Sequence, residues 1–480
     1  MGGGHSGQRL AARRRDASHL VLCGLAALWS PVPGAGMAQQ GAHATAPGAA
    51  TEQSAPVDAA APMQDTTAPG KPSSTETGHS PLDESFGPRT HADWVRDTRR
   101  QAWQDTKWNA QLRSYYLDRD KFDDSQNEAW SVGGSAGFET GYFRERFAFG
   151  ATGYTSQKLY GPEDKDGTAL LKPGQRSYTV LGELYGQFLL DPATRVTIGR
   201  RGFDTPYLNR NDSRMTPNTF QAATLQGLYG GEGSAEWRVG GGYFDRIKER
   251  NADGFVSMAS AAGAPDGIER GVYAGGANFK TGDFSIGAID YYSADLINIF
   301  YAETKYAVPV GAERRLQFAL QYSDQRSTGD DLLRGTAFSS RQWGGKAELG
   351  LGSALFTAAY SSVAGDIAMQ APWGGYPGFT GVQMEDFNRA GEEAWMLRAA
   401  YDFQSAKGLS VYGLWVNGSD PRDPGQYAKD EYDVNLQWTP ASGTLKGLSL
   451  RLRYAYVSQH DPAKSSLDDL RVMVYYDPAL

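Results

Sequence analysis

The segment Leu448–Tyr456, near the end of the chain, alternates between apolar and polar residues. Successive side chains of an extended strand point to opposite faces, so one face carries leucines and tyrosines while the other carries Arg451 and Arg453. Two arginines are costly in a dry core, and a row of large apolar side chains is unfavourable in water. Both problems disappear if the apolar face contacts lipid and the cationic face lines an aqueous lumen. The segment is therefore typical of a transmembrane β-barrel.

The N-terminus has the features of a secretory signal peptide. Three arginines at positions 13–15 precede the short apolar run 20–29, and small residues follow up to Ala38. The run is too short to span a bilayer as a helix, which is the alternative interpretation. We therefore expect a signal peptide over residues 1–38. Cys23 lies within it, so a mature chain would use neither disulfides nor thiolate chemistry.

Composition divides the rest of the chain into three parts. Residues 39–90 are rich in Ala, Pro and Thr and cannot bury a core, so we expect a disordered tail. Residues 91–107 form a short periplasmic segment in this interpretation, and residues 108–480 form the barrel. The alternation predicts about eighteen antiparallel strands, enough to enclose an aqueous channel. Their expected starts are 108, 129, 146, 177, 195, 220, 237, 271, 284, 299, 314, 341, 354, 394, 409, 431, 448 and 469.

The expected connections alternate in length. Short turns contain Asp191-Pro192, Gly282 or Lys407-Gly408, whereas long loops cover 156–176, 202–219, 249–270, 323–340, 363–393, 418–430 and 458–468. Short turns on one side and long loops on the other are typical of bacterial outer-membrane barrels. Aromatic residues at strand ends on the apolar face are expected to form interfacial girdles, with a soluble-barrel core as the alternative; they are Trp108, Trp130, Trp343, Trp395, Tyr401 and Trp438.

Four segments resemble the OprD-type outer-membrane porins. They are 385–403, 112–120, 212–220 and 444–453, and the resemblance extends over roughly residues 100–480. It implies an eighteen-stranded barrel with a narrow, substrate-selective pore. It also implies a track of basic side chains that guides a carboxylate, and an inward-folded third extracellular loop at 202–220. Two positions depart from the family pattern: Leu414 stands where a track arginine is expected, and Ile297-Asn298 replaces an acidic pair.

Alternation places a set of cations in the lumen. We expect them to form sites for anionic groups, because the arginine guanidinium pairs bidentately with carboxylate and stays charged. The alternative is that they brace the wall by pairing with lumen carboxylates such as Glu139, Glu183, Asp402 and Asp433. The predicted basic track comprises Arg113, Arg315, Lys346, Arg398, Arg451, Arg453 and Arg471.

The 202–220 segment is a candidate constriction because it is rich in charge and lies between prolines. An ordinary solvent-exposed loop is the alternative. The predicted constriction residues are Arg201, Asp204, Tyr207, Asn209, Arg210, Asp212 and Arg214. The loop 363–393 holds aromatic residues among glycines, and the sequence leaves open whether it packs into the lumen or covers the outside.

Other classes of function find little support. Five of the six histidines precede residue 92, and His460 lies in an expected loop beside Asp461, so no histidine base for hydrolysis is expected. We expect no enzyme activity, no cofactor and no metal site. A net charge of −8 argues against a nucleic-acid partner.

The leading hypothesis is an outer-membrane porin for passive uptake of small carboxylate-bearing solutes, such as amino acids and aromatic or other organic acids. A general diffusion porin for small hydrophilic solutes is the alternative, and a structural role in which the 39–90 tail tethers the barrel is a third. The expected partners are outer-membrane lipid and small anionic or zwitterionic solutes. Monomer and homo-oligomer both remain open.

Overall fold

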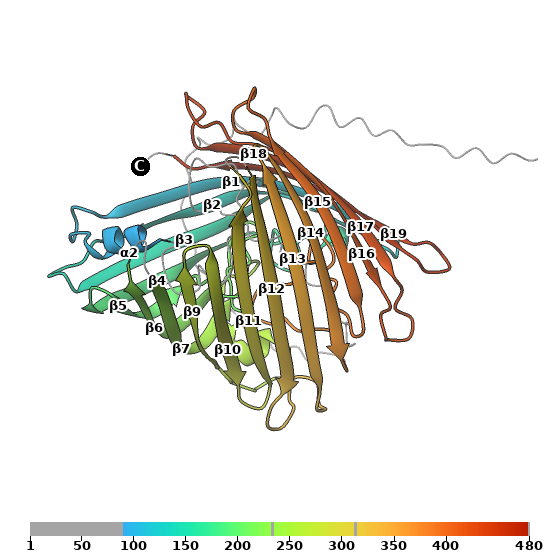
Figure 1. Ribbon diagram of the computed structural model, residues 1–480, viewed down its shortest axis with the longest axis horizontal. Coiled ribbons are helices and arrows are strands. Elements are labelled where there is room, and N and C mark those ends of the chain that lie inside the picture. Colours follow the sequence, from blue (N-terminus) through green and yellow to red (C-terminus); the bar gives the residue numbers. More distant parts are fainter. Residues whose placement is uncertain (1–89, 232–234, 312–313, 479–480) are drawn as a thin grey trace, which may run out of the picture. The chain divides into compact units, whose positions relative to one another are not determined.

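The computed structural model describes residues 90–231, 235–311 and 314–478, which fold into a closed antiparallel β-barrel (Figure 1). The expected signal peptide and nearly all of the expected tail lie outside the described residues. Among those that are described, no helix is long and apolar enough to cross a membrane.

Eighteen long strands and one short strand make up the sheet in the described residues. The first nine are β1 (Lys107–Asp120), β2 (Gln126–Glu139), β3 (Phe147–Tyr160), β4 (Tyr178–Asp191), β5 (Thr194–Arg201), β6 (Thr219–Gly230), β7 (Glu236–Lys248), the short β8 (Val256–Ser257) and β9 (Val272–Thr281). The rest are β10 (Phe284–Ser293), β11 (Ile297–Pro309), β12 (Arg314–Ser327), β13 (Ser339–Leu351), β14 (Ala354–Gly365), β15 (Glu393–Asp402), β16 (Leu409–Ser419), β17 (Lys429–Trp438), β18 (Leu448–Gln459) and β19 (Ser466–Tyr476). The helical elements are α2 (His91–Thr98), η1 (Glu163–Lys165) and α3 (Met258–Ala261).

Each long strand pairs with the next, and β1 pairs with β19 as well as β2, which closes the barrel. β7 pairs with β9 because β8 is a two-residue strand within the connection between them. The predicted barrel of about eighteen strands is confirmed, and every expected strand is present. The largest shifts are at β2, which begins at 126 rather than 129, and β19, which begins at 466 rather than 469.

The connections follow the expected pattern of lengths only in part. Long loops cover 161–177, 202–218, 249–271, 328–338, 366–392 and 420–428, all at the same end of the barrel. At that end, however, β1–β2 and β10–β11 are joined by the short turns 121–125 and 294–296. Asp124 and Asp295 have left-handed φ values of 61° and 64° there, a conformation that Asp adopts more readily than most residues. The turn 460–465 between β18 and β19 is also short, so the expected long loop 458–468 is wrong, and the connection 439–447 at the other end is as long as 420–428. The sequence prediction therefore overstated the alternation of loop length.

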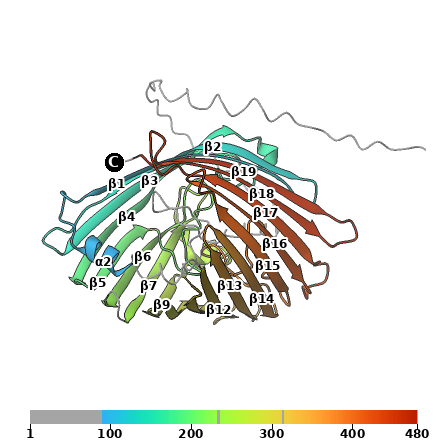
Figure 2. The same ribbon diagram turned by 45° about the horizontal axis from the view of Figure 1, so that its top comes forward.

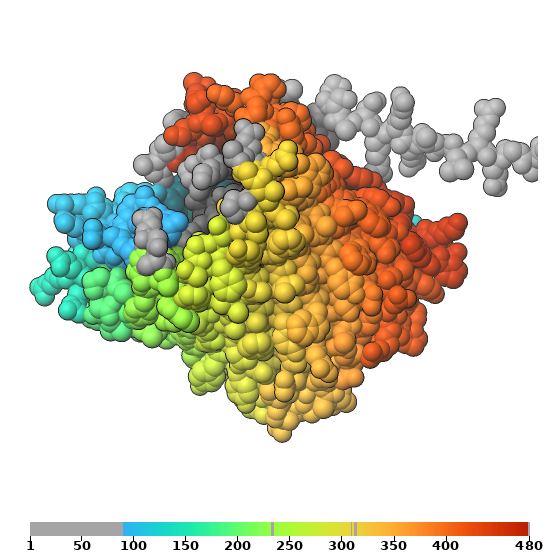
Figure 3. Space-filling model, in the orientation of Figure 1, coloured from blue at the N-terminus to red at the C-terminus, as the bar shows by residue number. Residues whose placement is uncertain are grey.

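The two faces of β18 behave as the sequence predicts. Leu452 is 44% exposed on the outside of the barrel, whereas its neighbour Arg453 is 4% exposed on the inside. On the same outer wall, Trp343 lies 4.3 Å from Tyr322 and Trp395 lies 4.6 Å from Tyr360, measured between ring centroids. Figure 3 shows the outer wall over the middle and C-terminal strands as one continuous surface. This surface is the one that contacts lipid.

The hydrophobic core lies inside the barrel rather than between two layers. Its largest cluster combines residues of the loops 202–218, 249–271 and 366–392 with inward-facing residues of β6, β7, β10 and β11. Figure 2 shows these loops within the ring of strands. The long loops at one end therefore fill much of the lumen instead of projecting away from it.

The segment before β1 docks at the end of the barrel that carries the short turns. Helix α2 begins after Thr90, whose side chain accepts a hydrogen bond from Asp93 N at 3.0 Å. Trp94 is 2% exposed and donates from Nε1 to Pro192 O, in the turn between β4 and β5, at 2.9 Å. The aromatic side chain and the capped helix fix this segment against the wall.

A charge on the lipid-facing wall should destabilise the barrel according to its depth. Leu320 is 62% exposed at the middle of β12, and Leu351 is 36% exposed at the end of β13. We expect Leu320→Arg to lower the unfolding free energy by about 2–4 kcal/mol and Leu351→Arg by no more than about 1 kcal/mol. Urea unfolding in phospholipid vesicles measures both. Equal effects of the two substitutions would contradict the assignment of the outer wall to lipid.

Candidate functional site

The loop 202–218, here called the constriction loop, crosses the lumen between opposite parts of the wall. At one end Tyr207, which is fully buried, shares a hydrogen bond of 2.7 Å between its hydroxyl and Ser323 Oγ on β12. At the other end Arg113 on β1 donates to both oxygens of Asp212, at 2.6 and 2.7 Å. Bidentate pairing of this kind fixes orientation as well as distance. The loop thus spans the barrel and divides its interior.

The remaining predicted constriction residues are held inside the barrel. Arg210 pairs with Asp204 at 2.6 Å, and this carboxylate holds the pKa of Arg210 above its usual value. Arg214 is fully buried and donates from Nε to Thr168 O at 2.8 Å. Its burial, followed by the nearby charges of Arg250 and Arg471, lowers the Arg214 pKa. Both arginines therefore hold the loop in place through contacts inside the barrel.

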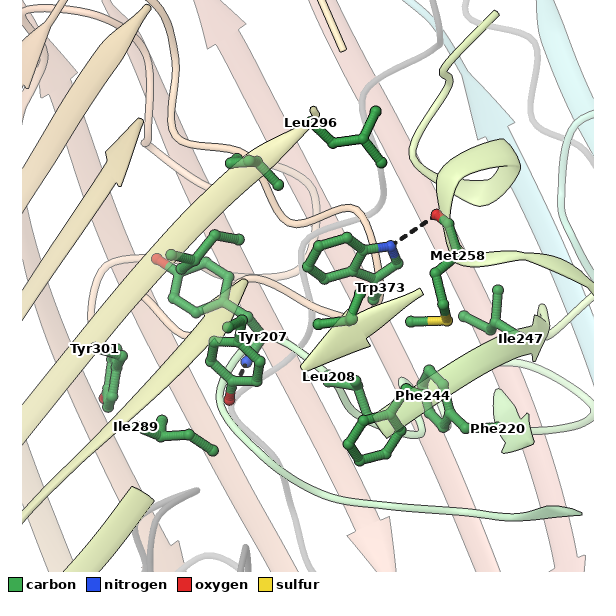
Figure 4. Close-up of a cluster of buried hydrophobic side chains, with 14 of the residues drawn as sticks. Tyr207, Leu208, Phe220, Phe244, Ile247, Met258, Ile289, Leu296, Tyr301 and Trp373 are labelled. Atoms are coloured by element: carbon green, nitrogen blue, oxygen red, sulfur yellow. Dashed lines mark hydrogen bonds between the residues drawn. The ribbon is translucent and has the colours of Figure 1, made fainter. Parts of the chain in front are cut away.

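A second loop, 366–392, here called the inner loop, packs against the constriction loop. Asn209 Nδ2 donates to Gly375 O at 3.0 Å, and Gly375 N donates to Asn209 Oδ1 at 2.8 Å. Trp373 is fully buried and donates from Nε1 to Met258 O at 2.9 Å (Figure 4). The structure therefore answers the question that the sequence left open, because the inner loop packs into the lumen.

Two carboxylates of β17 anchor the end of the inner loop. Glu431 accepts hydrogen bonds from Met384 N at 2.7 Å and Glu385 N at 2.8 Å. Asp433 accepts one from Gln383 N at 3.2 Å. Buried carboxylates that accept backbone N–H groups hold a loop tightly, because an unmade bond would leave a charge unsatisfied. These wall carboxylates position the loop.

The predicted basic track divides into a central group and outlying residues. On adjacent strands Tyr412, Asn435, Arg453 and Arg471 lie directly opposite one another in turn, and so form one row across the wall. Arg398 places its guanidinium 4.3 Å from the centroid of the Tyr412 ring. The central group comprises Arg398 on β15, Arg451 and Arg453 on β18, and Arg471 on β19. The first three lie near Tyr412 on β16, and Arg471 lies directly opposite Arg453.

The other three track residues lie elsewhere and have carboxylate partners, as does Arg471 of the central group, which pairs with Asp469. Arg113 forms the bidentate ion pair with Asp212 described above. Lys346 lies 3.5 Å from Glu348 and 5.0 Å from the centroid of the Phe379 ring. Arg315 is exposed at the end of β12, with Asp283 at 3.4 Å. These residues and Arg471 fit the bracing role better than Arg398, Arg451 and Arg453 do.

Several charged residues at the site were not among those that the sequence predicted. Arg119 on β1 points into the lumen and pairs with Asp469 at 2.9 Å; it shares the alternation of Arg113, which could have identified it. Arg250 donates to Ser213 Oγ at 2.6 Å, and burial next to Arg471 lowers its pKa to about 10. Asp386 of the inner loop is half-buried, and burial together with Glu385 raises its pKa to about 8. Arg250 and Asp386 lie in loops, where no periodicity marks orientation.

The guanidinium nitrogens inside the barrel that are unpartnered among the described residues can pair with an anion. Arginines near an aqueous path attract anions, and several modest sites permit both entry and release. His460 lies in the turn after β18, with Nε2 2.7 Å from Asp430 Oδ2 and 50% of its side chain exposed. Within the described ranges, no group of three His, Cys, Asp or Glu residues is placed to hold a metal ion.

Comparison with known proteins agrees with this geometry. The family model "outer membrane porin, OprD family" matches residues 101–480. Porin OccK9 (OpdG) of Pseudomonas aeruginosa is 24% identical with a TM-score of 0.71, and the alignment covers 78% of this chain and 99% of that one. OpdK of the same organism, solved with vanillate, is 23% identical with a TM-score of 0.68 and coverages of 78% and 99%. A BenF-like porin of Pseudomonas fluorescens Pf-5 is 20% identical with a TM-score of 0.69 and coverages of 79% and 100%.

No curated protein matched in a sequence search. The family model nevertheless covers most of the chain, including every strand of the barrel. Because the family consists of channels, it also confirms the expectation that the protein is no enzyme. The chain belongs to the OprD family of porins of the bacterial outer membrane.

Proposed function

We propose that this porin forms a narrow channel for passive uptake of small carboxylate-bearing solutes. The observation that carries the proposal is the set of guanidinium nitrogens in the central group. Arg398 Nε, Arg451 Nη2 and Arg453 Nε are buried and have no hydrogen-bond partner within the described part of the chain. An unmade bond to a buried charged donor is costly, so these groups favour an anion that supplies acceptors. A carboxylate matches their planar geometry.

The two loops would make the path narrow. The constriction loop and the inner loop meet through Asn209 and Gly375, and both attach to the wall by buried hydrogen bonds. A solute would therefore pass beside the basic wall and exchange part of its hydration for arginine contacts. Leu414 lies between Arg398 and Asp433 in the register of the strands, so the track has an apolar gap at this point.

The comparisons support a carboxylate-bearing solute without naming one for this chain. OpdK, which has the same fold, was solved with vanillate, a carboxylate. A general diffusion porin would instead pass solutes according to their size, with smaller ones passing faster and charge having little effect. The carboxylate of the solute is the feature that separates the two functions in an experiment.

Block of single-channel current by organic anions tests this function. We expect aromatic and aliphatic carboxylates to block the current, and neutral amides or sugars of the same size to leave it unchanged. Because a charge-assisted hydrogen bond is worth about 1.5–3 kcal/mol, Arg453→Gln should weaken block by about tenfold or more. Arg315→Gln is the matched control and should have no effect, because Arg315 is exposed and lies outside the central group. Equal block by acids and amides would support a general diffusion porin.

The charge of Asp386 should make selectivity depend on pH. Its pKa of about 8 means that the carboxyl is neutral below this pH and negative above it. We therefore expect the preference for anions, measured from reversal potentials, to fall as the pH is raised through about 8. Asp386→Asn should remove this step. A step that persists in Asp386→Asn would show that another group titrates in the pore.

A further inference from the structure

Glu139, at the end of β2, joins two parts of the chain that are remote in sequence. Arg100, which follows helix α2, pairs with Glu139 Oε1 through Nη2 and donates from Nη1 to the Glu139 carbonyl oxygen at 3.1 Å. Glu139 Oε2 receives Arg201 Nη2 at 3.4 Å and the hydroxyl of Tyr185. The side chain of Glu139 is 16% exposed, so these contacts are made with little competition from water.

On the N-terminal side, the contacts extend from Glu139 through helix α2. Asp97 accepts from Arg100 Nε at 3.0 Å and Lys107 Nζ at 2.9 Å, and its other oxygen lies 3.2 Å from Arg195 Nη1. Arg195, on β5, also places its guanidinium 4.6 Å from the centroid of the Trp94 ring. The helix is thus held by an ion network and a stacked aromatic ring together.

On the loop side, Arg201 is the last residue of β5 and directly precedes the constriction loop. Its guanidinium lies 4.5 Å from the centroid of the Tyr185 ring. The next residue, Gly202, donates its N–H to Glu183 Oε1 at 2.9 Å. A Cβ at Gly202 would lie 2.1 Å from Arg210 Nε, so the chain turns here in tight contact with its own loop. Arg201 therefore marks the point at which the loop leaves the wall.

We propose that segment 90–106 is a strap that holds the constriction loop in its conducting position, with Glu139 as the positioning residue between them. The inference goes beyond the proposed function, because it holds whichever solute passes. If α2 leaves its site, the ion pair between Arg100 and Glu139 breaks. The carboxylate of Glu139 can then move, and Arg201, which is bound to it, can move away from the wall. The constriction loop then gains freedom at its first residue while its far contacts, at Tyr207 and Asp212, remain.

Single-channel recording of full-length variants in planar bilayers tests the strap. Trp94→Ala releases the helix, and Glu139→Gln breaks the junction. We expect each to increase current fluctuations and time in subconductance levels by roughly tenfold. The double variant should match the single ones, because both act through one connection. Asp93→Asn, on the exposed face of α2, is the matched control and should behave as wild type.

Folding of each variant is checked separately by the heat-dependent shift in gel mobility that closed barrels show. Asp97→Asn is the substitute if Trp94→Ala does not fold, since it weakens the same docking site. Folded variants with wild-type fluctuations would overturn the proposal. Additive effects in the double variant would also overturn it, because they would mean that Glu139 acts on the wall independently of the strap. Carboxylate block persisting in noisy channels would support the strap and leave the proposed function intact.

Discussion

Every backbone N–H and C=O that crosses a membrane must find a partner within the protein, because lipid offers none. In this chain the requirement is met by pairing each long strand with the next and β19 with β1. In a closed barrel, the side chains of each strand point alternately into the lumen and to the outside. The inward set of β18 and β19 therefore includes Arg453 and Arg471, which lie directly opposite each other. The chemistry of the pore follows from the register of the wall.

The wall alone would enclose a wide channel, and the loops reduce it. Their burial is costly unless their backbone polar groups are satisfied, so polar residues of the wall act as anchors. Glu431 and Asp433 accept backbone N–H groups of the inner loop, while Ser323 bonds to Tyr207 of the constriction loop. The same face of the barrel thus carries two kinds of polar group. One kind fixes the loops, and the other, in Arg398, Arg451 and Arg453, has the donors that we propose bind a solute.

The sequence predicted the wall well and the interior poorly, for a physical reason. A strand has a period of two, so Leu452 and Arg453 reveal their faces directly, and the expected strand starts lie close to the observed ones. Loops have no such period. Nothing in the sequence places Arg250 beside Arg471, or Asn209 against Gly375, because these contacts depend on how separate loops pack. The role of the basic track and of the constriction residues therefore stays a prediction.

The proposed function depends most on an excess of positive charge along the permeation path. In the proposed function Arg398, Arg451 and Arg453 provide it, and the carboxylate of Asp433, which also anchors the inner loop, offsets part of it. The most direct measurement is the reversal potential of wild-type protein in a planar bilayer under a potassium chloride gradient at neutral pH. We expect a potential whose sign shows that chloride permeates faster than potassium. A potential near zero, or one of the opposite sign, would contradict the proposed function.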